Sequence, residues 1–322
     1  MAIRKNLPGI ENHAALYGGD TMSQSAIKNI GHSVNARLQN YAVRNNVPFE
    51  YVLLRYATER FLFRLGKSSL SDRFVLKGAT AFSVWFGPMF RVTRDADLHY
   101  SGNPAPDFLM ECFKKICRTD VPPDGVVFDL DSMRNSEIKK AQQYRGTRIT
   151  FHARIDQAKV SLQVDIAAGD AVHPAAETME YPELLDFGKP NIKVYPRYTV
   201  IAEKFQTMAV QGMRNSRLKD FFDLWLLSES FDFDFLILQT AVCETFRRRK
   251  TQIPDEIPVC LTEDFYSDPQ KQSQWNAFIR RINPEKAPAS LKEAVLRIVL
   301  LLRPFIVKDH VPAIWKAASF WQ

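Results

Sequence analysis

The segment from Lys159 to Ala167 alternates apolar and polar side chains, and this pattern restricts the fold more than any other in the chain. Its apolar positions are Val160, Leu162, Val164 and Ile166. Successive side chains of a β-strand point to opposite faces, so the segment predicts a strand with one face in a hydrophobic core and Asp165 on the other face. Such a strand belongs in a sheet whose second face carries polar groups.

Other segments predict a sheet with helices around it, followed by a run of helices. The expected strands are residues 74–77, 95–100, 126–130 and 147–155, and the expected helices are 48–65, 81–86, 105–117, 197–211, 216–230 and 234–249. The change from mixed to helical patterns falls between Lys189 and Pro196. We therefore expect a loose arm at residues 1–21, an α/β (α+β) domain at residues 22–195 and a helical domain at residues 196–322.

Composition sets broader limits. Of 322 residues, 46% are hydrophobic and 25% are charged, which excludes a disordered or coiled-coil chain. The net charge of +7 suits a polyanionic partner. No run of about 18 apolar residues or signal-peptide pattern occurs, so we expect no membrane association and a cytoplasmic location. The four cysteines form no CxxC pair, which favours reduced thiols over a zinc site or disulfides.

Three aspartates are candidate metal ligands. Asp95 and Asp97 stand two positions apart in the predicted strand 95–100, so both carboxylates project from the same face. Carboxylates on a rigid strand suit Mg²⁺, which binds one or two of them together with substrate phosphates. Asp165 would add a third carboxylate from a neighbouring strand, as two-metal phosphoryl transfer requires. An exposed acidic pair and an unrelated exposed strand aspartate remain the alternatives.

A glycine turn and a lysine are candidates for phosphate binding. Gly78 and Thr80 lie between a buried strand and a helix, where backbone N–H groups and a hydroxyl favour a phosphate, although such a turn is also an ordinary helix start. The turn is not a P-loop, because GxxxxGK[ST] is absent. Lys204 lies at the margin of the apolar side of helix 197–211, where a lysine either extends to solvent or pairs with a triphosphate.

Charged residues on three predicted helices leave two interpretations open. In helix 216–230, Lys219, Asp220 and Asp223 form either surface ion pairs or a partly buried polar cluster beside the aromatic stripe. Along helix 48–65, Arg55, Arg60 and Arg64 form either a solvated basic face or an RNA contact. The run Arg247-Arg248-Arg249-Lys250 is either a solvated helix end or a contact to a polyanion.

Five motifs in a fixed order resemble the AbiEii/AbiGii-type toxin nucleotidyltransferases, which include the MenT toxins and belong to the DNA polymerase β-like nucleotidyltransferase superfamily. The motifs are Lys77-Gly78-Ala79-Thr80, Arg91-x-Thr93-Arg94-Asp95-Ala96-Asp97, Val164-Asp165, Ala202-Glu203-Lys204 and Arg217-x-Lys219-Asp220-x-x-Asp223. The resemblance covers about residues 25–230. Each motif is weak alone, and their order and spacing make the set specific.

The resemblance implies a nucleotidyltransferase-like mixed sheet flanked by helices, followed by a C-terminal helical domain. It implies a toxin of an abortive-infection or toxin–antitoxin system with a cognate antitoxin, and Mg²⁺-dependent transfer of a nucleotide from an NTP to an RNA acceptor, tRNA in the MenT branch. The implied catalytic residues are Asp95, Asp97, Asp165, Lys204, Asp220 and Asp223. The implied nucleotide-binding residues are Gly78, Thr80, Lys204 and Lys219, and the implied metal ligands are Asp95, Asp97 and Asp165.

Two positions depart from the family pattern. Ala79 stands where glycine is more common, and its methyl group restricts the turn. Lys219 stands where arginine is common, which keeps the charge but loses the planar guanidinium. Neither change removes a metal carboxylate, so we expect an active enzyme. The same residues would serve transfer to a protein or small-molecule hydroxyl, and Ala79 leaves open a non-catalytic NTP- or RNA-binding regulator.

Overall fold

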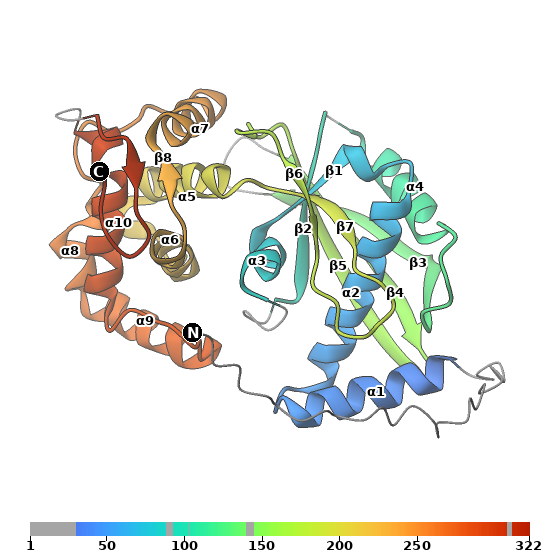
Figure 1. Ribbon diagram of the computed structural model, residues 1–322. Coiled ribbons are helices and arrows are strands. Elements are labelled where there is room, and N and C mark those ends of the chain that lie inside the picture. The colour runs from blue at the N-terminus through green and yellow to red at the C-terminus, as the bar shows by residue number, and fades with distance from the viewer. Residues whose placement is uncertain (1–29, 88–92, 103, 140–144, 308–310) are drawn as a thin grey trace, which may run out of the picture.

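The computed structural model describes residues 30–87, 93–102, 104–139, 145–307 and 311–322. The expected arm at residues 1–21, the first residues of the expected α/β domain, and Arg91 of the second motif lie outside them. The described residues form a seven-stranded mixed sheet with helices packed on it, followed by a mainly helical part (Figure 1). The α/β class predicted from the sequence is therefore confirmed.

The described residues of the first part of the chain form the sheet, four α-helices and one short 3-10 helix. Its helices are α1 (Ile30–Arg44), α2 (Phe49–Lys67), the short η1 (Ser71–Arg73), α3 (Gly78–Phe86) and α4 (Pro106–Cys117). Its strands are β1 (Phe74–Lys77), β2 (Asp95–Tyr100), β3 (Val126–Lys139), β4 (Arg145–Ile155), β5 (Ala158–Ala168), β6 (Glu177–Glu180) and β7 (Asn191–Val194). The sequence patterns located β1, β2, β4 and β5 but ended β3 at residue 130, inside the β-bulge between Asp129 and Arg134 that interrupts its register.

The strand order β3-β4-β5-β2-β1-β7-β6 places β2 near the middle of the sheet. β2 runs parallel to β5 on one side and antiparallel to β1 on the other, and this register sets Asp97 opposite both Asp165 and Lys77. β7 joins the sheet by pairing parallel to β1. β6 and β7 were not predicted from the sequence.

The core under the sheet lies between its apolar face and the helices α1, α2 and α4. Val160, Leu162, Val164 and Ile166 of β5 are all buried there, as the alternation predicted. Helix α2 crosses this face (Figure 1) and inserts Tyr56 and Phe61 into the core. The ring of Phe61 packs against Phe113 of α4 and Phe151 of β4, with centroids 5.0 and 5.5 Å away. The opposite, polar face of the sheet takes no part in this core.

The three arginines of α2 are neither solvated nor on an RNA-binding surface, so both interpretations drawn from the sequence are wrong. Arg55, Arg60 and Arg64 are at most 7% exposed. Arg60 donates to the Glu59 carboxylate at 2.6 Å and to two carbonyl oxygens of the segment before β7. This connecting segment folds over α2, which the helix periodicity alone does not reveal.

Arg64 forms a buried ion pair with Asp124, which stands just before β3. The guanidinium donates to both carboxylate oxygens, at 2.7 and 3.1 Å, and the Val126 N–H donates to the same carboxylate. The Tyr56 hydroxyl donates to the Asp124 carbonyl at 2.8 Å. These bonds attach the start of β3 to α2.

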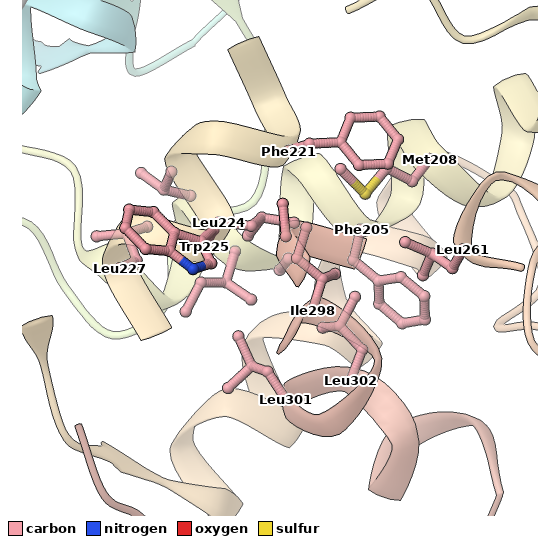
Figure 2. Close-up of a cluster of buried hydrophobic side chains, with 14 of the residues drawn as sticks. Phe205, Met208, Phe221, Leu224, Trp225, Leu227, Leu261, Ile298, Leu301 and Leu302 are labelled. Atoms are coloured by element: carbon pink, nitrogen blue, oxygen red, sulfur yellow. The ribbon is translucent and has the colours of Figure 1, made fainter. Parts of the chain in front are cut away.

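The second part of the chain is mainly helical and has its own core. Its helices are α5 (Arg197–Gln211), η2 (Gly212–Arg214), α6 (Leu218–Ser230), α7 (Phe235–Arg248), η3 (Val259–Leu261), α8 (Glu263–Tyr266), α9 (Pro269–Ile282) and α10 (Leu291–Ile306). A small two-stranded sheet pairs β8 (Phe233–Asp234) antiparallel with β9 (Ile314–Trp315). Figure 2 shows Phe205 and Met208 of α5, Leu224 of α6 and Ile298 of α10 meeting in this core.

Val75, Phe82 and Tyr195 from the sheet side join the helical core, so the two parts share apolar packing. The division at residues 195 and 196 stays a proposal. None of the helices in the described part of the chain combines the length and apolarity needed to cross a membrane.

We expect Asp124→Ala to destabilise the protein by about 3–5 kcal/mol, because it leaves the buried Arg64 guanidinium without its carboxylate. Urea denaturation monitored by circular dichroism measures this free energy of unfolding. The control is Asp120→Ala at a nearby exposed residue, which should change it by less than about 0.5 kcal/mol. A loss below about 1 kcal/mol for Asp124→Ala would show that the pair does not hold β3 to α2.

Candidate active site

A cavity of about 820 Å³ opens between the polar face of the sheet and the helices α5 and α6. The predicted site residues that line it are Gly78, Asp95, Asp97, Asp165, Lys204, Lys219, Asp220 and Asp223. They come from segments up to 145 positions apart in the chain, since the first is residue 78 and the last is residue 223. The tertiary structure therefore gathers into one cavity every predicted site residue except Thr80.

Asp95 and Asp97 project into the cavity from the same face of β2. Both side chains are partly exposed, whereas Ala96 and Leu98 between and beyond them are buried in the core below. Thr93 donates a hydrogen bond of 2.9 Å to the Asp95 carboxylate. The strand thus presents two carboxylates side by side, as the i, i+2 spacing predicted.

Gly78 lies against Asp97 so closely that no larger residue fits. A Cβ atom at this position would stand 1.9 Å from Oδ2 of Asp97 and 2.8 Å from its Cβ. The residue also has φ +65°, in the left-handed region that glycine adopts without strain. Helix α3 begins at this glycine, so its first backbone N–H groups lie beside the carboxylate pair at the cavity. Ala79, the departure from the family pattern, also lines the cavity.

Thr80 has a different position from the one expected. Its side chain is buried, and its hydroxyl donates to the backbone carbonyl of Asp95 at 3.2 Å. It does not line the large cavity and instead borders a small space behind Asp95. The geometry makes Thr80 a residue that positions β2 against α3, and it lends no support to a direct phosphate contact by this hydroxyl.

Asp165 lies beside Asp97 in the ladder, but its carboxylate is held by Arg148 of β4. The guanidinium donates to both oxygens, from Nε at 2.8 Å and from Nη2 at 2.9 Å. This hydrogen bonding raises the pKa of Arg148, and attraction from Asp165, Asp95 and Asp97 adds to it. The positive charge of Arg148 therefore acts on all three carboxylates. The sequence patterns did not indicate Arg148 as a residue of the site.

Lys204 connects α5 to α6 through two buried carboxylates. Its Nζ donates to Asp220 at 2.6 Å and to Asp223 at 2.8 Å, and Arg217 donates to the second oxygen of Asp220 at 2.6 Å. Burial opposes the ionisation of Asp220, but Lys204 and Arg217 outweigh it and hold its pKa at about 2. Burial likewise lowers the pKa of Lys204, but the two aspartates raise it above its ordinary value. The partly buried polar cluster is confirmed for Asp220 and Asp223, which are buried, whereas Lys219 is exposed; the burial of both aspartates makes the prediction of surface ion pairs wrong for them.

A second ionic network lies next to this cluster and was not foreseen. Lys77 of β1 donates to Asp170 at 3.0 Å and to Glu203 of α5 at 3.2 Å. Arg249, just after α7, contacts the same two carboxylates at 3.2 and 3.4 Å. These four side chains are at most 18% exposed, so Arg249 is neither a solvated helix end nor a surface contact to a polyanion. Two cations and two anions thus join the sheet to the helical part.

Part of this network carried a signal in the sequence. Lys77 and Glu203 stand inside two of the five motifs, whereas Asp170 follows β5 without any pattern. Arg148 falls among the polar positions of an ordinary strand, so only the sheet register brings it to Asp165.

The residues around Asp95 and Asp97 fit a magnesium ion with two protein ligands. Both carboxylates line the cavity, and the missing side chain of Gly78 gives the Asp97 carboxylate the room it occupies there. Mg²⁺ commonly binds one or two carboxylates and completes its octahedron with phosphates and water. Among the described residues, no three His, Cys, Asp or Glu side chains are arranged to hold a metal ion. Asp165 is engaged by Arg148, so the three-ligand set expected from the sequence is not assembled in this arrangement.

The sequence and the site agree with one protein family. Residues 60–297 match the family described as the nucleotidyl transferase AbiEii toxin of type IV toxin–antitoxin systems. This match covers more than half of the chain, so the chain belongs to that family and is a toxin-type nucleotidyltransferase. No curated protein matches it.

Two crystal structures of Helicobacter pylori proteins are similar to the structure. JHP933 is 18% identical, with 77% of this chain and 90% of that chain covered and a TM-score of 0.44. A candidate nucleotidyltransferase from H. pylori is 16% identical, with 76% and 90% covered and a TM-score of 0.41. The family membership rests on the sequence match.

We expect Gly78→Ala to abolish nucleotide binding, because the added methyl group displaces the Asp97 carboxylate. Gly87→Ala is the matched control: Gly87 also has a positive φ, +89°, but nothing lies within 4 Å of its added Cβ. Gly87→Ala should lose about 1 kcal/mol of stability in urea denaturation from backbone strain, and Gly78→Ala should lose more, because its methyl group also clashes with Asp97. Only Gly78→Ala should lose the rise in melting temperature that an NTP produces, and equal NTP responses of the two variants would refute the close-packing argument.

We expect the protein to lose stability in mild acid through His99, which lies on β2 two positions beyond Asp97. Burial, with Lys77 nearby, lowers its pKa from 6.5 to about 4 against a weaker opposing pull from Asp170. The unfolded chain therefore binds the proton more tightly, and stability falls as the pH drops from about 6.5 towards 4.

Because the unfolded chain takes up this proton more readily, the free energy of unfolding should fall by about 2 kcal/mol between pH 7 and pH 5 through His99 alone. Urea denaturation at both pH values should show that His99→Gln reduces the acid loss by this amount. The variant His32→Gln, at an exposed histidine, should keep the acid loss of the unmodified chain. An unchanged acid loss in His99→Gln would contradict the assignment.

Proposed function

We propose that this nucleotidyltransferase transfers a nucleoside monophosphate from an NTP to a hydroxyl of an RNA acceptor, with tRNA as the acceptor and Mg²⁺ as the cofactor. The observation that carries the proposal is that one cavity is lined both by the Asp95–Asp97 pair and by Lys204 with its partners Asp220 and Asp223 on α5 and α6. A metal-binding group and a phosphate-binding group on opposite walls suit a triphosphate held between them.

Asp95 and Asp97 are the proposed ligands of Mg²⁺. When bound, the ion supplies neutralising charge for the phosphates of the NTP. Asp165 is proposed as the third carboxylate, and its participation requires that Arg148 release it. Until then, Arg148 offsets the mutual repulsion of the three carboxylates.

The proposed nucleotide-binding groups are the backbone N–H groups at Gly78 and the cations across the cavity. Asp220 and Asp223 hold Lys204 in place, so its charge is positioned before the nucleotide arrives. Lys219 is exposed and lines the same cavity, where it can meet a phosphate or base. Thr80 acts indirectly, through its bond to the Asp95 carbonyl.

The proposed reaction is an in-line displacement at the α-phosphorus. The acceptor hydroxyl oxygen forms a bond to this phosphorus, and the bond to the bridging oxygen breaks, so that pyrophosphate leaves with the electron pair. The hydroxyl proton passes to a carboxylate of the site or to water. The residues of the chain contribute positioning and charge stabilisation and form no covalent bond to the substrate.

Charge supports RNA as the acceptor. The chain carries a net charge of +7, and Arg217 and Lys250 line the cavity together with Lys219. The Arg217 side chain is 54% exposed, so it is accessible to a large ligand. Because the family belongs to toxin–antitoxin systems, we also propose a cognate antitoxin as a partner. A cytoplasmic location stays a prediction.

We expect Asp97→Asn to lower the rate of transfer at least about 100-fold, because it removes a charge that must stabilise the reacting phosphates. The assay combines purified protein, bulk tRNA, Mg²⁺ and each α-labelled NTP in turn, with labelled RNA measured on a denaturing gel. Asp120→Asn, at an exposed aspartate outside the cavity, should retain full activity. Chelation with EDTA should stop the reaction, and added Mg²⁺ should restore it.

The same assay tests the alternatives. Label on protein or on a small molecule, with none on RNA, would replace the RNA acceptor by another hydroxyl. Absence of any transfer, with NTP raising the melting temperature equally with and without Mg²⁺, would identify a non-catalytic regulator. Either result would overturn the proposal.

A further inference from the structure

The polar face of strands β3, β4 and β5 is exposed, and it continues directly from the cavity. Residues directly opposite in an antiparallel ladder share a face, so the register assigns each side chain to one side of the sheet. The pairs on the side of Asp165 are Arg148–Asp165, Thr150–Gln163, His152–Ser161 and Arg154–Lys159. β3 adds Ser136 opposite Arg148 and Arg134 opposite Thr150.

Exposure shows that the described helices leave this face open. Arg134, Ser136, Arg154, Lys159 and Ser161 are all exposed. Val127, opposite Arg154 on the same face, is 67% exposed although it is apolar. The helices that contact these strands lie on the other side, where β4 and β5 bury their apolar residues. We call the surface formed by Arg134, Ser136, Thr150, His152, Arg154, Lys159 and Ser161 the open face.

The open face is basic. Arg134, Arg154 and Lys159 are positively charged side chains on it. On this side of the sheet, the register of the described strands also places two acidic residues, Asp129 opposite His152 and Asp165 opposite Arg148. One nitrogen of Arg134, Nη1, donates to the carbonyl oxygens of Asp131 and Met133 in its own strand, and the residue as a whole is exposed.

The open face extends away from the reacting groups in a defined direction. Arg148, at the cavity, and Arg154 stand six residues apart on β4, which is about 20 Å at the rise of a β-strand. Hydroxyl and amide side chains of Ser161, Thr150 and Gln163 lie between the basic ends. This length exceeds an NTP and matches several nucleotides of a polynucleotide chain.

We propose that the acceptor RNA of the transfer reaction binds across the open face, with its phosphates on Arg134, Arg154 and Lys159 and its reacting end at Asp165. This inference rests on the proposed function and assigns the position of its acceptor. Cations interleaved with hydroxyl and amide groups are the side chains that contact phosphate and sugar oxygens. Val127 is the one strongly exposed large apolar side chain that the register places there, whereas protein interfaces are built on apolar and aromatic anchors.

The test compares two triple variants of the full chain that lose the same charge. Arg134→Ala/Arg154→Ala/Lys159→Ala removes the cations of the open face. Arg44→Ala/Arg118→Ala/Arg280→Ala removes three exposed arginines from α1, the end of α4 and α9, and serves as the control. Binding of fluorescently labelled bulk tRNA is measured by anisotropy between 50 and 200 mM salt.

The open-face variant should bind tRNA at least about 10-fold more weakly than the unmodified chain at 100 mM salt. The slope of log affinity against log salt should fall by about 2 to 3, because about one counterion is released per phosphate contact. The control variant should keep the affinity and slope of the unmodified chain. NTP-induced thermal stabilisation should be unchanged in both variants, since neither alters the cavity.

Equal loss in both triple variants, or no loss in the open-face variant, would overturn the proposal. Loss of antitoxin binding by the open-face variant with unchanged tRNA binding would also overturn it, in favour of a protein partner. Transfer activity on RNA is scored separately. If the unmodified chain labels tRNA and the open-face variant does so with unchanged KM, the proposed function stands and the open face is not the acceptor site.

Discussion

The contact between Gly78 and Asp97 is the constraint on which the site depends. Because residue 78 lacks a side chain, α3 begins directly against β2, and its first N–H groups lie beside the carboxylate pair. Thr80 fastens the same two elements from behind through the Asp95 carbonyl. The position of Asp97 in turn sets its neighbours, since the sheet register places Asp165 on one side of it and Lys77 on the other.

Charge compensation explains how so many ionic groups coexist around one cavity. Isolated carboxylates and ammonium groups would be costly to bury, so each is paired: Asp165 with Arg148, Asp220 and Asp223 with Lys204, and Asp170 and Glu203 with Lys77 and Arg249. The last of these groups, formed by Lys77, Asp170, Glu203 and Arg249, also connects the sheet to the helical part. The ion pairs that shape the site therefore also fix the relative position of its two walls.

Local patterns predicted much of this arrangement because they show which side chains of a segment lie on the same face. The alternation in β5 predicted that one face of the strand is buried, and the spacing of Asp95 and Asp97 predicted that both carboxylates lie on one face of β2. Patterns of this kind could not place the arginines of α2, because the burial of Arg55 and Arg60 depends on a connecting segment more than 100 residues later in the chain, and that of Arg64 on Asp124, 60 residues later. Arg148 was missed for the same reason: its partner is chosen by strand register.

The sequence by itself determined the class of fold, the family and the residues of the two walls of the cavity, because strand and helix periodicity and motif order are local properties. Only the tertiary structure decided which of those residues meet. In the tertiary structure Asp165 is paired with Arg148, and the Thr80 hydroxyl is bonded to the Asp95 carbonyl outside the cavity. One face of β3, β4 and β5 is not covered by the described helices. Register, long-range ion pairing and the packing of distant segments set these outcomes, and none of them is encoded within a single stretch of chain.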